Sequence, residues 1–97
     1  TRELRVIHGK QSSFYKKAFV KEDEEGTKYL YSYYQRIVTN YGKALKFEED
    51  FNLYSNTTMR HVREYLQQIG KGELAKLSKS KLFKRLEKTE YIILDIL

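Results

Sequence analysis

The feature that most constrains the fold is residues 54–70, YSNTTMRHVREYLQQIG, in which a helix start, an apolar face and a helix end can all be read. Ser55 and the Asn and Thr residues after it can accept hydrogen bonds from the amides of a first helical turn. Gly70 can adopt the left-handed conformation that closes the last turn. Apolar residues between them recur at spacings of three and four, so they share one face. That face comprises Met59, Val62, Tyr65 or Leu66, and Ile69, while Arg60, Arg63, Glu64 and Gln67 are expected to point away.

Chain length and composition limit what this helix can pack against. Ninety-seven residues are enough for one domain with one core. The absence of cysteine excludes thiol catalysis, thiolate metal sites and redox switching, and it fits a reducing compartment. Nine Tyr and five Phe indicate that aromatic rings fill part of the core. The longest apolar run, residues 91–94, is far shorter than the roughly 20 residues of a membrane helix, so we expect a cytoplasmic protein without membrane association.

The first half of the chain favours β-structure. Residues 4–7 and 12–21 are predicted strands, and the charged segment 22–26 ends in Gly26, which suits a hairpin turn. Residues 29–38, YLYSYYQRIV, are predicted to form one strand, with Tyr29, Tyr31 and Tyr33 on one face and Leu30, Ser32 and Tyr34 on the other. Residues 40–42 are typical of a turn, and residues 43–47 of another short strand.

The last third of the chain is basic and partly helical. Leu74 and Leu77 fit one helical turn, and Ser78 or Ser80 can cap another turn whose apolar side includes Leu82. One kinked helix or two short helices would satisfy this pattern. The tail after residue 88 is rich in isoleucine and favours a terminal strand, with a continuing helix as the alternative.

Together these elements predict an α+β fold. We expect a small antiparallel sheet of three to five strands, with the amphipathic helix of residues 57–69 packed on one face and a second, basic helix after it. The chain is expected to be a single domain, residues 1–97. It would consist of a core at about 12–69, a basic helical extension at 71–88 and an apolar tail at 89–97.

Three blocks of sequence carry a resemblance to a known family. They are SFYKKAFV at residues 13–20, LYSY at 30–33, and YSNTTMRH at 54–61 followed by Tyr65 and Leu66. Their order and spacing over residues 12–69 resemble a family of small bacteriophage and prophage proteins of unknown function, with the pattern SFYxKAxV, LYSYxTxVA and YSxTTxRHxxxFL. This sequence departs from that pattern at two places. Gln35 stands where the family often has Thr, and Ile37-Val38 stand where the family has Val-Ala. The resemblance implies a phage-type accessory protein and brings no known activity or catalytic residues.

His61 is the one obvious candidate for metal binding or proton transfer, because a neutral imidazole can do either near pH 7. Such a site needs further ligands. His8 is distant in sequence, and the carboxylate nearest at helical spacing, Glu64, can pair with Arg60 instead. We therefore interpret His61 as a hydrogen-bonding structural or surface residue. Thr57 and Thr58 are interpreted as capping residues rather than nucleophiles.

Charge is the clearest pointer to a partner. The net charge is +6, and residues 71–88 hold seven basic against two acidic side chains, a local excess of +5. Cations on one helix face attract phosphates through counterion release. The alternative is an ordinary solvated helix whose lysines serve solubility. The candidate nucleic-acid-binding residues are Arg60, Arg63, Lys76, Lys79, Lys81, Lys84, Arg85 and Lys88.

The tyrosine-rich segment supplies a second candidate surface. Exposed rings on a sheet can stack bases or form a protein-binding patch, although a sheet covered by a helix buries about half of its side chains. This possible aromatic interaction surface consists of Tyr29, Tyr31, Tyr33 and Tyr34.

The sequence thus predicts a non-catalytic, phage-type accessory protein that binds nucleic acid through a basic surface. The alternative is a protein-interaction module that inhibits or redirects a host factor, for example in a defence system, or that self-assembles, for instance as a homodimer. Paired carboxylates in a supporting context, a Gly-rich phosphate loop and a nucleophile with a base are not identifiable. We therefore expect no enzyme activity, no cofactor and no metal.

Overall fold

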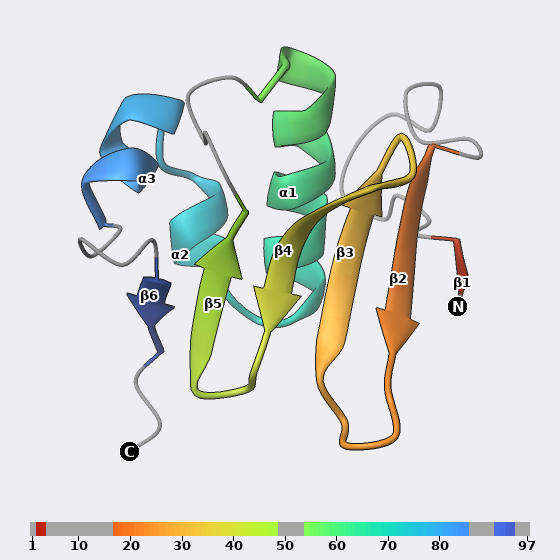
Figure 1. Ribbon diagram of the computed structural model, residues 1–97. Helices are drawn as coiled ribbons and strands as arrows, with labels where there is room; N and C mark the ends of the chain where they lie inside the picture. The colour runs from red at the N-terminus through yellow and green to blue at the C-terminus, as the bar shows by residue number, and fades with distance from the viewer. Residues whose placement is uncertain (1, 4–16, 49–53, 86–90, 95–97) are drawn as a thin grey trace.

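In the described part of the chain, six antiparallel strands form one sheet, in which each strand pairs with its neighbour in the sequence. The computed structural model describes residues 2–3, 17–48, 54–85 and 91–94 (Figure 1). The predicted strand at residues 4–7 and the first half of that at 12–21 lie outside the described residues. The strands are β1 (Arg2–Glu3), β2 (Ala18–Glu22), β3 (Lys28–Ser32), β4 (Gln35–Asn40), β5 (Ala44–Phe47) and β6 (Tyr91–Ile93).

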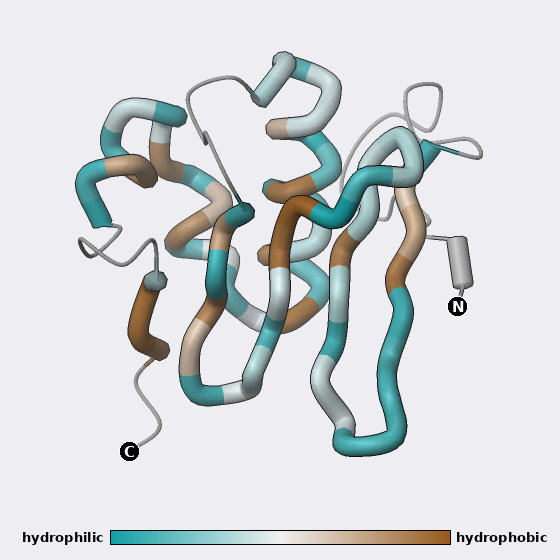
Figure 2. The backbone as a smooth tube through the Cα atoms, in the orientation of Figure 1, coloured by the Kyte–Doolittle hydropathy of each residue, from teal (hydrophilic) through white to brown (hydrophobic). Residues whose placement is uncertain are grey.

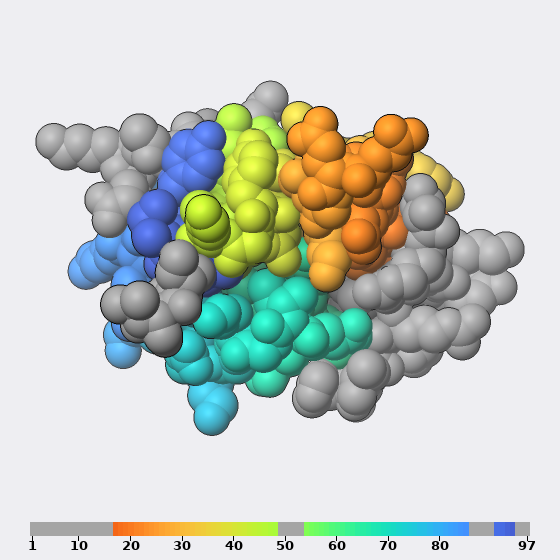
Figure 3. Space-filling view, turned by 90° about the horizontal axis from the view of Figure 1, so that it is seen from below, coloured from red at the N-terminus to blue at the C-terminus, as the bar shows by residue number. Residues whose placement is uncertain are grey.

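The helices lie on one side of this sheet. They are α1 (Asn56–Gln68), α2 (Gly72–Ala75) and α3 (Lys79–Arg85). Figure 1 shows α1 and α2 behind the strands, and Figure 3 shows the strands as one layer with α1 and α2 as a second. The predicted α+β class with an antiparallel sheet is confirmed, and the two-residue β1 adds a sixth strand to the three to five expected. The sheet face away from α1 is not covered by any of the described helices.

Both ends of α1 are fixed as the sequence predicts. The Ser55 hydroxyl accepts a hydrogen bond from the Thr58 amide at 3.0 Å, which satisfies one donor of the first turn. At the other end Gly70 has φ +82°, and its amide donates to the Gln67 carbonyl at 3.1 Å. The Lys71 amide donates to the Leu66 carbonyl at 2.8 Å, completing a Schellman motif.

The core lies between the sheet and the helices. Along β2, β3 and β5 alternate side chains are buried, as expected for strands with one covered face. Figure 2 shows hydrophobic residues where strands pass α1 and a hydrophilic tip on the β2–β3 hairpin. The largest fully buried side chains are Phe47, Leu30, Leu45, Met59, Leu66, Leu82, His61, Val38 and Val62.

The prediction of one strand over residues 29–38 was wrong. The chain reverses at Tyr33 and Tyr34, so that β3 ends at Ser32 and β4 begins at Gln35. Neither residue is a usual turn former, which is why the reversal was missed. As predicted, Tyr29 and Tyr31 lie on the face opposite to that of Leu30 and Ser32. Tyr33 and Tyr34 do not continue this alternation, because they form the turn itself.

Three further predictions are settled here. Glu64 does not point away from the core: it is buried, and its carboxylate accepts from the Gln68 amide group at 2.7 Å. The basic region forms two short helices, α2 and α3, and the Ser78 hydroxyl accepts from the Lys81 amide at 3.2 Å as a helix cap. Residues 91–93 form strand β6 rather than a helix.

Candidate nucleic-acid interface

The sheet face that points away from α1 carries aromatic rings with cations beside them. Residues paired across antiparallel strands lie on the same face. Phe19 pairs with Tyr31, which in turn pairs with Arg36. The next row pairs Lys21 with Tyr29, Tyr29 with Thr39, Thr39 with Lys46 and Lys46 with Tyr91, and Thr39 at its centre is buried. We call this surface the open face and define it by Phe19, Lys21, Tyr29, Tyr31, Tyr34, Arg36, Lys46 and Tyr91.

Two cationic side chains on the open face lie over aromatic rings. The Arg36 guanidinium carbon lies 5.4 Å from the centre of the Tyr29 ring, and the Lys46 Nζ lies 6.0 Å from that of Tyr91. Both distances are in the range of cation–π contacts. Arg36 also forms an ion pair with Glu48, with 3.4 Å between Nε and Oε1, and its side chain is still 49% exposed. These contacts hold the cations close to the rings while leaving Arg36 accessible to a phosphate.

An acidic group at the edge of the open face, Asp23, is held by hydrogen bonds. The Asp23 carboxylate accepts from the Tyr29 hydroxyl at 2.9 Å and from the amides of Glu25 and Thr27. The hydrogen bond from Tyr29 is the main cause that lowers the pKa of Asp23 below its ordinary value, and it raises the pKa of Tyr29 in return. Asp23 is therefore ionised at neutral pH and is confined to the β2–β3 turn.

The turn between β3 and β4 has an unusual backbone. Tyr33 has φ 52° and Tyr34 has φ 67°. Positive φ at both central residues is typical of the type I′ hairpin turn, which normally takes Asn and Gly. For a residue with a Cβ this conformation costs about 1–2 kcal/mol. This backbone conformation places the two rings on opposite sides of the sheet. The Tyr33 ring centre lies 5.9 Å from that of His61, and Tyr34 stacks on Phe19 with 5.7 Å between ring centres.

A shallow cavity adjoins this stacked pair. Its volume is about 330 Å³, and Phe19, Lys21, Tyr31 and Tyr34 line it. The Tyr34 side chain, 79% exposed, projects from the turn beside it. Because three of the four lining residues that the structure describes are aromatic and the fourth is a lysine, the cavity suits a flat ring that carries a negative charge nearby.

The motif residues of the second and third sequence blocks meet on the other side of the sheet. The Ser32 hydroxyl lies 2.7 Å from His61 Nδ1 and 3.1 Å from the Thr58 hydroxyl, which also accepts from Ser55 at 3.2 Å. Ser32 and His61 are buried. A serine beside a histidine could in principle act as a nucleophile, but a substrate must reach it. The network instead links β3 to α1, and the structural interpretation of His61 fits this position.

The predicted basic residues separate into two groups. Lys79 donates to the Tyr54 carbonyl at 2.6 Å, and Arg63 donates to the Leu77 carbonyl at 3.5 Å, so both help to join α1 to the segment around α3. Lys81, Lys84 and Arg85 are exposed and share one face of α3. Arg60 and Lys76 are exposed on α1 and after α2, and Lys88 lies outside the described residues.

Sequence reasoning missed several residues of the open face. Phe19, Lys21, Arg36, Lys46 and Tyr91 were not selected, because each strand was considered separately. The usable signal was the two-residue spacing, which puts Phe19 and Lys21 on one face of β2 and Tyr29 and Tyr31 on one face of β3. The four predicted tyrosines divide: Tyr29, Tyr31 and Tyr34 belong to the open face, whereas Tyr33 lies near His61.

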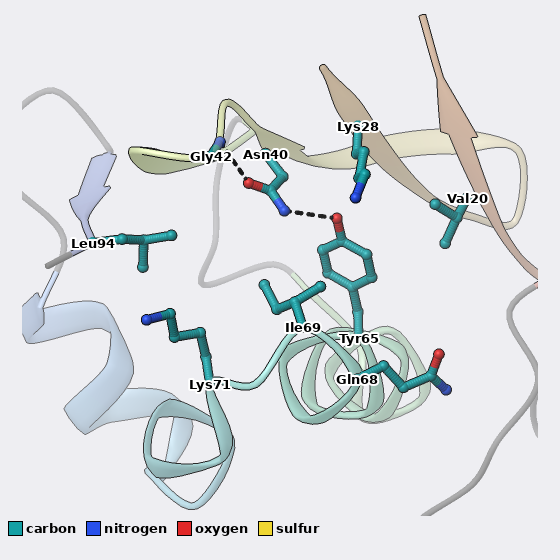
Figure 4. Close-up of a pocket in the computed structure, with 9 residues that line it drawn as sticks. All are labelled: Val20, Lys28, Asn40, Gly42, Tyr65, Gln68, Ile69, Lys71 and Leu94. Atoms are coloured by element: carbon teal, nitrogen blue, oxygen red, sulfur yellow. Dashed lines mark hydrogen bonds between the residues drawn. The ribbon is translucent and has the colours of Figure 1, made fainter. Parts of the chain in front are cut away.

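A second cavity, of about 380 Å³, lies between the sheet and the end of α1 (Figure 4). The Lys28 ammonium and the Tyr65 hydroxyl point into it, and Asn40 donates to that hydroxyl at 3.1 Å. Lys71 also lines it. The C-terminal end of a helix carries partial negative charge. This charge opposes the attraction of the two lysines for an anionic ligand. We therefore assign no ligand to this cavity.

The described residues contain no group of three or more His, Asp or Glu side chains arranged to hold a metal ion. Within the same part of the chain, no helix has the length and apolar character needed to cross a bilayer.

The fold and the open face define a small α+β module with one sheet surface that the described helices cover and one that they leave uncovered. The chain belongs to a family of unknown function, DUF8033, whose model matches residues 2–84. Comparison with curated proteins gives no match, and comparison with solved structures gives none either.

Proposed function

We propose that this protein is a non-catalytic nucleic-acid-binding protein that uses the open face as its binding surface. The observation that carries the proposal is that cations lie beside aromatic rings on the sheet side that the described helices leave uncovered. Rings can stack bases, and Lys or Arg beside them can neutralise phosphates. The exposed cations of α3 add long-range attraction, since the chain carries a net charge of +6.

The biological setting follows from the three sequence blocks described above. Their resemblance to bacteriophage and prophage proteins supports a role as a phage-type accessory factor in the cytoplasm of a bacterial host. The burial of Ser32 and His61 supports a role that does not involve catalysis. Lysine is depleted in the cores of protein–protein interfaces, so Lys21 and Lys46 favour nucleic acid over a protein partner on the open face.

The test compares two triple variants with equal loss of charge. One carries Lys21→Gln, Arg36→Gln and Lys46→Gln on the open face, and the other carries Lys81→Gln, Lys84→Gln and Arg85→Gln on α3. Binding of a fluorescently labelled single-stranded oligonucleotide is measured by anisotropy over a range of salt concentrations. We expect the open-face variant to lose more affinity and to reduce the salt slope by about 2, since each phosphate contact contributes about 0.7.

The same experiment can reject the proposal. If the wild-type protein binds neither DNA nor RNA at low salt, nucleic-acid binding is ruled out. If the α3 variant loses more affinity than the open-face variant, the interface lies on α3. Circular dichroism of both variants controls for loss of fold.

A second candidate function is binding to a host protein or to another copy of the chain. The observation in its favour is the edge strand β6, where Ile93 is 68% exposed and Tyr41 approaches Tyr91 with 6.3 Å between ring centres. Exposed apolar residues at a strand edge are typical of interaction sites. Affinity capture from infected cells, with and without nuclease, separates the two functions. Retention of a host protein after nuclease treatment would favour this second function.

A further inference from the structure

We propose that the Phe19–Tyr34 cavity binds one unpaired base, and that the protein therefore selects single-stranded over double-stranded nucleic acid. This inference rests on the proposed function and specifies its ligand. It concerns the cavity of about 330 Å³ that Phe19, Lys21, Tyr31 and Tyr34 line. That volume lies at the lower end of the range for ligand sites, roughly 300–1,000 Å³.

The first argument is the cost of placing Tyr34. Its φ of 67° is strained for any residue with a Cβ, and its side chain is 79% exposed. A glycine would relieve the strain and remove an exposed ring. Among the described residues, the ring contact that Tyr34 makes is with Phe19, at 5.7 Å and an interplanar angle of 27°. Strained backbone that presents a side chain to solvent is typical of binding sites.

The second argument is the chemistry of the lining. Tyr31 and Phe19 are paired neighbours on adjacent strands, so both rings lie on the same face, where they line the cavity as its aromatic floor. Lys21 lies two residues after Phe19 on the same face, and Arg36 pairs with Tyr31 on the other side. A base stacked on this floor thus has a cation on either side for its flanking phosphates. This charge complementarity identifies a nucleotide as the occupant.

The third argument concerns strandedness. A base in a duplex is stacked on both faces and paired at its edge, so it cannot lie on a protein ring without being extruded. An unpaired base can stack on a ring with a gain of about 1–3 kcal/mol. The cavity opens on a sheet surface, where the backbone of a single strand can lie along the rings.

The test uses an oligonucleotide of about 12 nucleotides, within the site sizes of small binding folds. It carries one 2-aminopurine, whose fluorescence reports base stacking, and is compared with the same sequence as a duplex. We expect Tyr34→Gly to weaken single-strand binding about 5- to 100-fold, because it removes a stacking ring without adding strain. Tyr34→Phe should keep wild-type affinity, because it preserves the ring.

Tyr33→Asn is the matched control. It changes the same turn at the same kind of backbone position, but the ring it removes lies near His61 rather than on the open face. We expect an effect within about twofold. A weakening equal to that of Tyr34→Gly would show that turn geometry, rather than stacking, controls binding, and would overturn the inference.

Two other outcomes separate this inference from the function on which it rests. If single strand and duplex bind equally and Tyr34→Gly has no effect, base stacking is rejected while nucleic-acid binding stands. If no nucleic acid binds to the wild-type protein, both are rejected, and the aromatic surface is left to a protein partner.

Discussion

The two faces of one sheet illustrate two different uses of the same strands. The face toward α1 carries aliphatic side chains such as Leu30 and Leu45, which are fully buried, together with one polar network around His61. The open face carries rings and cations that are partly exposed. Burial determines the residues on the first face. On the second, packing alone does not require the repeated pairing of a ring with a cation, and this is the reason to interpret that face as a binding surface.

Neighbouring residues on opposite faces give the largest expected contrast. Leu30→Ala should lower the free energy of unfolding by about 2–5 kcal/mol, because it removes a fully buried side chain from a packed core. Tyr31→Ala, one residue along the same strand, should cost clearly less because its ring is only partly buried. Urea denaturation measures both. Equal losses would show that the open face is also part of the core.

Disrupting the polar network on the covered face should have the next largest effect on stability. Ser32→Ala removes the partner of His61 Nδ1 in a buried site, and we expect a loss of about 1–3 kcal/mol. Ser80→Ala, on the exposed side of α3, is the control and should change stability by less than about 0.5 kcal/mol. A Ser32→Ala variant as stable as the wild type would show that this network does not hold β3 against α1.

The strained turn predicts an inversion of the usual ranking of Ala and Gly. At φ 67°, Tyr34→Ala keeps the steric cost of a Cβ while losing the contact with Phe19, whereas Tyr34→Gly loses the contact and relieves the strain. The Gly variant should therefore be more stable than the Ala variant by about 1 kcal/mol. Thermal and urea unfolding of the pair tests this order. The opposite order would mean that Tyr34 is not strained in solution.

The smallest expected effect concerns Asp23 at the edge of the open face. Its pKa is lowered in the folded protein, so its contribution to stability is present above the unfolded pKa and is lost as pH falls through the folded value, below about 3.8. Tyr29→Phe removes the hydrogen bond that is the main cause of this lowered pKa. The pKa of Asp23, followed by carboxyl carbon NMR, should then rise toward its ordinary value. An unchanged pKa would show that the amides of the turn suffice.

The covered face could be predicted from the sequence, because burial produces periodicity. Met59 and Val62 repeat at helical spacing, and Ser55 and Gly70 are recognisable caps, so α1 was predicted almost to the residue. The turn at Tyr33 and Tyr34 could not be predicted from the sequence, because tyrosine is not a typical turn residue. The strained backbone there is compensated by interactions outside the local sequence. Glu64 was misplaced for a similar reason, since its burial depends on a tertiary environment.

The open face was only partly predictable because it is assembled from five strands. Tyr29 and Tyr31 were identified, but their neighbours Lys21 and Arg36 become neighbours only through strand pairing. Register depends on where the chain turns, and a missed turn displaces every later pairing. The basic side chains of α3 were easier to recognise as a group because they are close in sequence.

The most direct test of the central claim is a chemical-shift titration of the ¹⁵N-labelled protein with a single-stranded oligonucleotide. If the open face binds nucleic acid, the largest changes will fall on β2, β3 and the Tyr33–Tyr34 turn, with smaller changes at Lys46 and Tyr91. Changes confined to Lys81, Lys84 and Arg85 of α3, or no changes at all, would contradict it.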